Sequence, residues 1–216
     1  MSGVPFSLFS VMGRCIQDLI RTKFDSHDMG IFFREAMRLI ESDNFDLAFG
    51  YINAAIDRSA SDEDKLNLYL LKCEALLGQL VTATGDSIND NRSQMLTPGV
   101  VQSERALLIR EKIFDVVDAT LAINPRFYLA HYFRGLAYLA TLDFRNFLRA
   151  LDDALTLEPD EGIKLQILDF QAKLYSVATL DCYDPQKAIN CCEKILQIDS
   201  TNEDALFLLR LLRGDQ

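Results

Sequence analysis

Residues 130–159 hold two short segments whose apolar residues recur at helical spacing, separated by a turn at 141–143. Gly135 in the first segment and Ala154 in the second stand where two packed helices would touch. Pro159 is expected to stop the second helix. One such pair cannot bury its own apolar face, so it needs similar pairs on both sides. The chain is therefore predicted to be a stack of helix pairs.

The helical pattern extends over most of the chain, and no stretch keeps the alternation of a β-strand for long. The predicted helices cover residues 5–22, 29–41, 45–58, 64–80, 103–123, two segments within 130–159, 161–177, 185–198 and 201–213. Asp184 before Pro185 is a strong start signal, and Gly214 is a typical helix end. Residues 82–102, rich in Thr, Ser, Asn and Asp, are expected to be an exposed insertion. We predict an all-α protein.

Composition excludes several classes of protein. The net charge of −10, with no basic run of five or more residues, argues against nucleic-acid binding. The five cysteines form no CxxC pair, which favours reduced thiols in a cytoplasmic protein over a disulfide framework or a zinc site. No apolar run reaches the roughly 18 residues of a membrane-spanning helix.

Residues 1–25 support two interpretations. The predicted amphipathic helix within them could pack on the following helices as a cap or fill a groove between them. Alternatively it is a membrane-surface or targeting helix, because the first 17 residues contain Arg14 and no acidic residue. Membrane association therefore stays open as an alternative.

No set of residues suggests catalysis. The two histidines, His27 and His131, have no second ligand at metal-binding spacing, and no glycine-rich phosphate loop or nucleophile elbow occurs. Asp152 and Asp153 are adjacent and would diverge on a helix. We therefore expect a non-enzyme without cofactor or metal.

Small and aromatic residues repeat at matched offsets in two predicted helix pairs. The matched residues are Ala36, Phe45, Ala48 and Ala55 in the first, and Gly135, Phe144, Phe147 and Ala154 in the other. With a period of about 34 residues, this pattern resembles the tetratricopeptide repeat. The resemblance places four repeats within a domain of residues 26–216, at 29–62, 66–127 (with the insertion 82–102), 128–161 and 165–200, followed by a capping helix at 201–213. Phe147 replaces a usually small residue, which favours a wider hairpin, and His131 stands at the family's tryptophan position.

The resemblance implies a right-handed α-solenoid whose concave groove, lined by the first helix of each repeat, binds peptides. The groove positions are Phe33, Met37, Leu70, Glu74, Leu129, Tyr132, Leu136 and Leu139. In the fourth repeat they become polar, with Gln166, Asp169 and Lys173.

The predicted groove lacks the basic clamp with which some family members hold the acidic tails of chaperones. Phe33, Met37, Leu71, Leu129 and Phe133 occupy the clamp positions. The expected function is thus a protein-interaction adaptor or scaffold that binds an apolar or amphipathic helix, with a simple core role for these side chains as the alternative. The sequence leaves the oligomeric state open.

Overall fold

The structure, a computed structural model, describes residues 30–89 and 104–214. In these residues it contains nine α-helices and no strand, so the all-α prediction is confirmed there. The helices are α2 (Gly30–Glu41), α3 (Phe45–Arg58), α4 (Asp62–Asn89), α6 (Glu104–Ile123), α7 (Tyr128–Ala140), α8 (Phe144–Leu155), α9 (Glu161–Tyr175), α10 (Pro185–Ile198) and α11 (Glu203–Arg213). The helix predicted at 5–22 lies outside the described residues.

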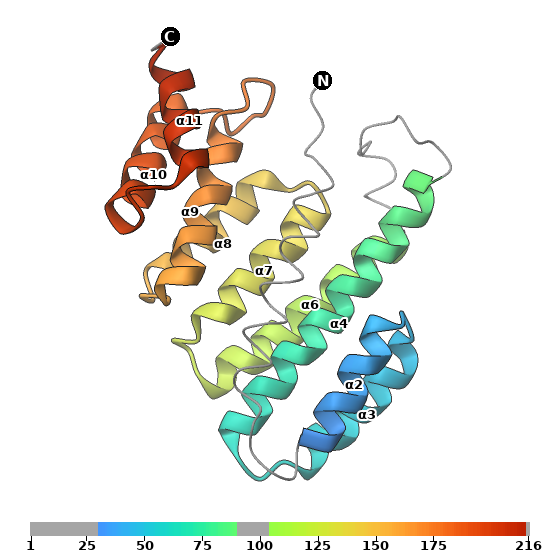
Figure 1. The fold of residues 1–216 in the computed structure, drawn as a ribbon. Helices are drawn as coiled ribbons and strands as arrows, with labels where there is room; N and C mark the ends of the chain where they lie inside the picture. Colours follow the sequence, from blue (N-terminus) through green and yellow to red (C-terminus); the bar gives the residue numbers. More distant parts are fainter. Residues whose placement is uncertain (1–29, 90–103, 215–216) are drawn as a thin grey trace.

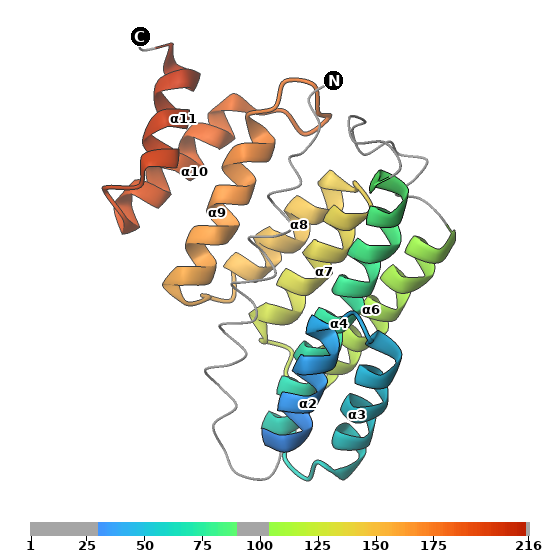
Figure 2. The same ribbon diagram turned by 45° about the vertical axis from the view of Figure 1, so that its right-hand side comes forward.

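The helices pack in sequential pairs, as Figures 1 and 2 show. The pairs are α2 with α3, α4 with α6, α7 with α8, and α9 with α10. The second helix of each pair also packs on the first helix of the next pair, and α11 packs on α10. This order of contacts is consistent with a helical repeat.

Two of the pairs have turns of the same construction. Asp43 after α2 and Leu142 after α7 both have a left-handed backbone, with φ of 56° and 57°. In each turn the next amide donates to a carbonyl of the preceding helix, from Asn44 to Leu39 at 2.8 Å and from Asp143 to Tyr138 at 3.0 Å. These bonds satisfy carbonyls at the helix end that would otherwise have no partner. The match between these two hairpins, inferred from side-chain types, therefore extends to the backbone of their turns.

Phe147 does not widen its hairpin, and that prediction was wrong. α7 and α8 have the most extensive contact of any helix pair among the described residues, and Phe147 is fully buried between them. Its ring lies over Gly135, where an added Cβ would be 3.3 Å from the Phe147 Cδ2. The ring also meets Phe170 of α9 edge-on, with 5.9 Å between the ring centroids. The missing side chain of Gly135 makes room for the large side chain of Phe147.

One predicted boundary was also wrong. α4 does not end near Leu80 but continues to Asn89, so the first part of the expected insertion is helical. No proline interrupts residues 82–89, and a helix can pass through polar residues when nothing removes its hydrogen bonds. α8 ends at Leu155, before Pro159, and the chain turns at Glu158 with φ of 55°.

The start of α10 and the end of α11 are confirmed. The Asp184 carboxylate accepts a hydrogen bond from the Lys187 amide at 3.0 Å, and Pro185 occupies the first turn. Gly214 ends α11 with φ of 73°, a conformation that glycine adopts without strain.

Candidate functional site

The predicted groove residues lie on three helices that the fold places side by side. Phe33 and Met37 are on α2, Leu70 and Glu74 are on α4, and the other four are on α7. α4 contacts both α2 and α7, and Figures 1 and 2 agree on this arrangement. The structure therefore brings together residues that are up to about a hundred positions apart in the sequence.

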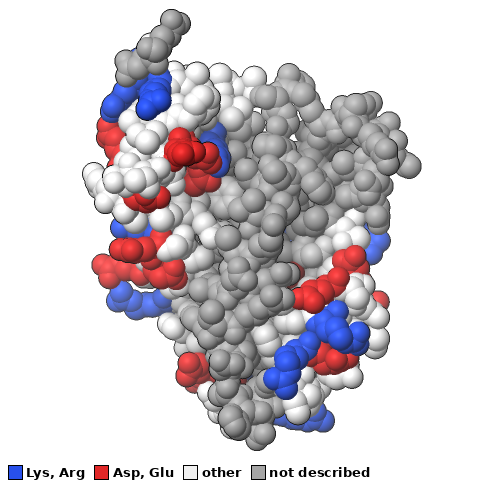
Figure 3. Space-filling view, in the orientation of Figure 1, with Lys and Arg blue, Asp and Glu red and all other residues white. Residues whose placement is uncertain are grey.

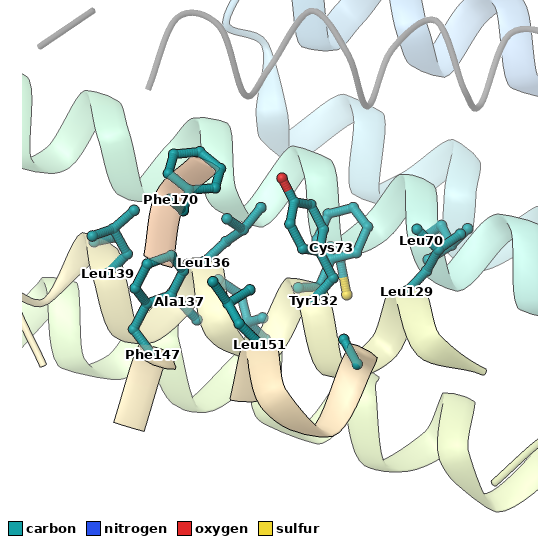
Figure 4. Close-up of a cluster of buried hydrophobic side chains, with 14 of the residues drawn as sticks. Leu70, Cys73, Leu129, Tyr132, Leu136, Ala137, Leu139, Phe147, Leu151 and Phe170 are labelled. Carbon is teal, nitrogen blue, oxygen red and sulfur yellow. The ribbon is translucent and has the colours of Figure 1, made fainter. Parts of the chain in front are cut away.

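The α7 part of this set can be followed in Figure 4. Leu129 lies beside Leu70 of α4, and Tyr132 and Leu136 follow along α7. Phe147 and Leu151 of α8 reach α7 from another side, next to Ala137. α7 thus uses one side to pack against α8 and another side for the row of residues that it shares with α4.

All eight predicted groove residues are buried. The most exposed is Glu74 at 7%, and Tyr132 and Leu139 are at 0%. None of them is part of an open surface in this structure. Burial suits the core alternative, and the role of these residues in binding stays a prediction.

The buried row ends at a polar junction between α7 and α9. The Tyr132 hydroxyl donates to the Gln166 Oε1 at 3.3 Å, and the Tyr128 hydroxyl donates to the Asp160 Oδ2 at 2.5 Å. Asp160 also caps α9 by accepting from the Ile163 amide at 3.0 Å. Burial, with the hydrogen bond to Asp160 as the second cause, raises the pKa of Tyr128 well above its ordinary value, so the phenol stays protonated.

The three positions of α9 predicted to continue the groove, Gln166, Asp169 and Lys173, are polar and partly exposed. The Lys173 Nζ donates to Asp169 at 2.8 Å and to Asp204 of α11 at 3.2 Å. Burial lowers the pKa of Lys173, but the two carboxylates outweigh it, so the pKa is raised. The side chains at these positions of α9 are thus polar and partly exposed, whereas the predicted groove positions on α2, α4 and α7 are buried.

The cysteines and His131 do not have the properties of reactive groups. The described cysteines are all free, and burial raises the pKa of Cys191 to about 11 and that of Cys73 further. Such thiols stay protonated and are poor nucleophiles. Burial, helped by Arg134 and opposed by Asp153, lowers the pKa of His131. In the part of the chain that the structure describes, no group of three or more His, Cys, Asp or Glu could hold a metal ion.

Two open clefts were not anticipated from the sequence. A cleft of about 370 Å³ lies between α8 and the segment before α10, and one of about 290 Å³ lies between α3, α4 and α6. The first mixes charges, since Arg145 and Lys187 face Asp152 and Asp181. Its residues come from two helix pairs, so no local pattern could reveal it. On the face seen in Figure 3, positive and negative side chains of the described residues are interspersed.

No protein-family model matches the chain, and no curated protein matches it. The resemblance to tetratricopeptide repeats therefore depends on the residue pattern and on the order of helix contacts. None of the helices in residues 30–89 and 104–214 combines the length and apolarity needed to cross a bilayer.

Proposed function

We propose that this protein is a non-catalytic interaction scaffold of tetratricopeptide type. The first helices α2, α4 and α7 would form its concave groove, and a partner would occupy the groove with the apolar side of an amphipathic helix. An enzyme is the weaker proposal, because burial raises the pKa of every described cysteine, which makes each of these thiols a poor nucleophile.

The observation that carries the proposal is the equivalence of the apolar row in two hairpins. Phe33 and Tyr132 hold the same place relative to the left-handed turn of their hairpin, and so do Met37 and Leu136. α4 lies between these two helices and adds Leu70 and Glu74. A repeated row across adjacent helices is how stacked helix pairs build an extended binding surface.

The polar end of the row suggests an orientation for the partner. We expect the apolar side of the partner to lie toward Tyr132 and Leu136, and a polar segment to lie toward Gln166 and Lys173 of α9, which are partly exposed. A basic clamp for an acidic tail is missing from this row, so a helix anchored by apolar residues is the better match.

Because the row is buried, the proposal requires that a helical segment of a partner can be identified in contact with it. A diazirine photo-crosslinking residue of about the size of methionine would replace Met37 or Leu136, with exposed Leu108 on α6 as the control position. After irradiation in cell extract, we expect Met37 and Leu136, but not Leu108, to link to a helical segment of one other protein.

Mass spectrometry of the linked peptides distinguishes the alternatives. Links to residues 6–22 of the same chain would mean that the chain fills its own groove. Links confined to α2, α4 and α7 would mean that these residues are only core, and the proposal would fail.

A second candidate is an adaptor held at a membrane surface by residues 1–25, which lie outside the described residues. The observation in its favour is the single Arg14 with no acidic residue among the first 17. Flotation with anionic liposomes tests it: the full chain should float, and a chain beginning at Ser26 should not. Equal flotation of the two would remove this candidate.

A further inference from the structure

The outer side of α11 is apolar although this helix lies at one end of the stack (Figures 1 and 2). Phe207 is 69% exposed and Leu211, one helical turn later, is 66% exposed. The other side of the helix is occupied, since Ala205 is buried and Leu208, Leu209 and Leu212 pack against the core. A terminal helix of a stack ordinarily turns a polar side to water. α11 instead has apolar residues on both sides, as a helix covered on both sides does.

This exposed side belongs to a helix that is capped at both ends and paired with its neighbours. Asn202 caps its start by accepting from the Ala205 amide at 3.0 Å, and Gly214 ends it in the left-handed conformation. Arg213 pairs with Glu193 of α10 at 2.5 Å, and Asp204 pairs with Lys173 of α9 at 3.2 Å. Phe207 and Leu211 therefore project from a helix that has defined ends and contacts both α9 and α10.

The charges beside the apolar pair point to a specific occupant. Glu203 lies one turn before Phe207, Arg210 lies one turn after it, and both are exposed. Among the described residues, neither of these two charged side chains enters an ion pair. Along the helix, the exposed side thus begins with the acidic Glu203, continues with Phe207, and ends with the basic Arg210 beside Leu211.

A pattern of this kind is complementary to itself when reversed. If a second α11 lies antiparallel across the first, Phe207 meets Phe207 of the other copy, and each Glu203 faces an Arg210. A parallel arrangement would instead place like charges together.

We infer that α11 is the contact surface between two copies of this chain, paired antiparallel about a twofold axis. One helix of 11 residues offers less area than the roughly 800 Å² per partner of a standard interface, so the dimer is weak and depends on concentration. This surface is separate from the proposed groove on α2, α4 and α7.

Sedimentation velocity of the full chain over a wide concentration range tests the inference. We expect a reversible monomer–dimer equilibrium that Phe207→Glu weakens about tenfold or more, because it places two charges at the centre of the contact. Leu108→Glu is the matched control, since Leu108 is 58% exposed on α6 and lies outside this surface. It should leave the equilibrium unchanged. Circular dichroism of each variant checks that the helices are retained.

A charge exchange tests the antiparallel arrangement. Glu203→Arg and Arg210→Glu should each weaken the dimer because like charges then meet, and the double variant should restore it. A chain that stays monomeric at all concentrations, or a Leu108→Glu variant that is equally impaired, would overturn the inference. So would a double variant that is not restored. Assemblies larger than dimers would also overturn it, because they require head-to-tail contact with the other end of the stack, where Leu47 and Tyr51 are exposed.

Discussion

At the scale of single residues, glycines on similar helices have opposite roles. Gly50 lies in the middle of α3 with open space where a Cβ would be, whereas a Cβ on Gly135 would meet Phe147, Leu151 and Ala150. Gly50→Ala should stabilise the fold by about 0.5–1 kcal/mol through helix propensity. Gly135→Ala should destabilise it by about 1 kcal/mol, because the overpacking of a fully buried ring exceeds that gain. Urea unfolding followed by circular dichroism measures both.

The mechanism at Gly135 can be checked with a second change. In a Phe147→Leu background, Gly135→Ala should cost less than it does alone, because the smaller side chain can give way. A cost that is unchanged would show that the contact with Phe147 is not the cause.

His131 makes stability depend on pH. Its pKa is lowered in the folded protein, mainly by burial, so the unfolded chain binds the proton more readily. The contribution of neutral His131 to the stability of the fold is fully present above the ordinary histidine pKa of about 6.5, and it is lost as the pH falls below that value. Urea unfolding between pH 8 and pH 5 should show stability falling toward acid, and His131→Gln should reduce this fall. His27 is present in both proteins, so the difference between them reports His131. Equal slopes would contradict the prediction.

At the scale of the elements, the helix ends depend on a few side chains. Asp184→Ala should destabilise the protein by about 1 kcal/mol, because the carboxylate caps α10 through the Lys187 amide. Asp181→Ala is the control. Asp181 is an exposed acid in the same loop, its one ion pair among the described residues is with exposed Arg145 at 3.5 Å, and its loss should change stability little. Thermal unfolding of the two variants side by side checks this, and equal losses would exclude the cap as the cause.

Local signals predicted the elements well where a short-range rule decides them. The turn at 141–143, the start of α10 and the end at Gly214 each depend on residues within one turn of the chain. The extension of α4 could not be foreseen in the same way, because residues 82–89 are mostly small or polar and suit a loop and a helix alike. The fit of Phe147 over Gly135 depends on two helices together, and the sequence pattern treated each position separately.

At the scale of the whole molecule, the stack is not uniformly held. α8 and α9 touch less extensively than the corresponding helices at the other two junctions between pairs, and the ring pair of Phe147 and Phe170 lies at this junction. In a stack of helix pairs each unit is stabilised mainly by its neighbours. We expect amide hydrogens of α9, α10 and α11 to exchange sooner than those of α6, α7 and α8 in hydrogen-exchange mass spectrometry. Phe170→Ala should widen this difference, and exchange that is uniform across both groups would contradict it.

The candidate groove could be predicted only in part. The sequence pattern identified which residues of α2, α4 and α7 would come together, because equivalent positions follow from the repeat. Their burial could not be predicted, since a side chain on a first helix has the same apolar character whether it faces a partner or the interior. The apolar outer side of α11, with Phe207 and Leu211, was missed for a related reason. The spacing of the apolar residues in this helix is compatible with burial of one side or of both sides.

The fit between Gly135 and Phe147 has a consequence for the evolution of this chain. In the first hairpin the equivalent positions are Ala36 and Ala48, both buried, so each helix there contributes one small side chain, whereas the other hairpin has a glycine on one helix and a large ring on the other. A descendant that replaced Phe147 with alanine would leave a void that a larger residue at 135 could fill. Descendants should therefore change the two positions together, and a change at only one of them should be rare.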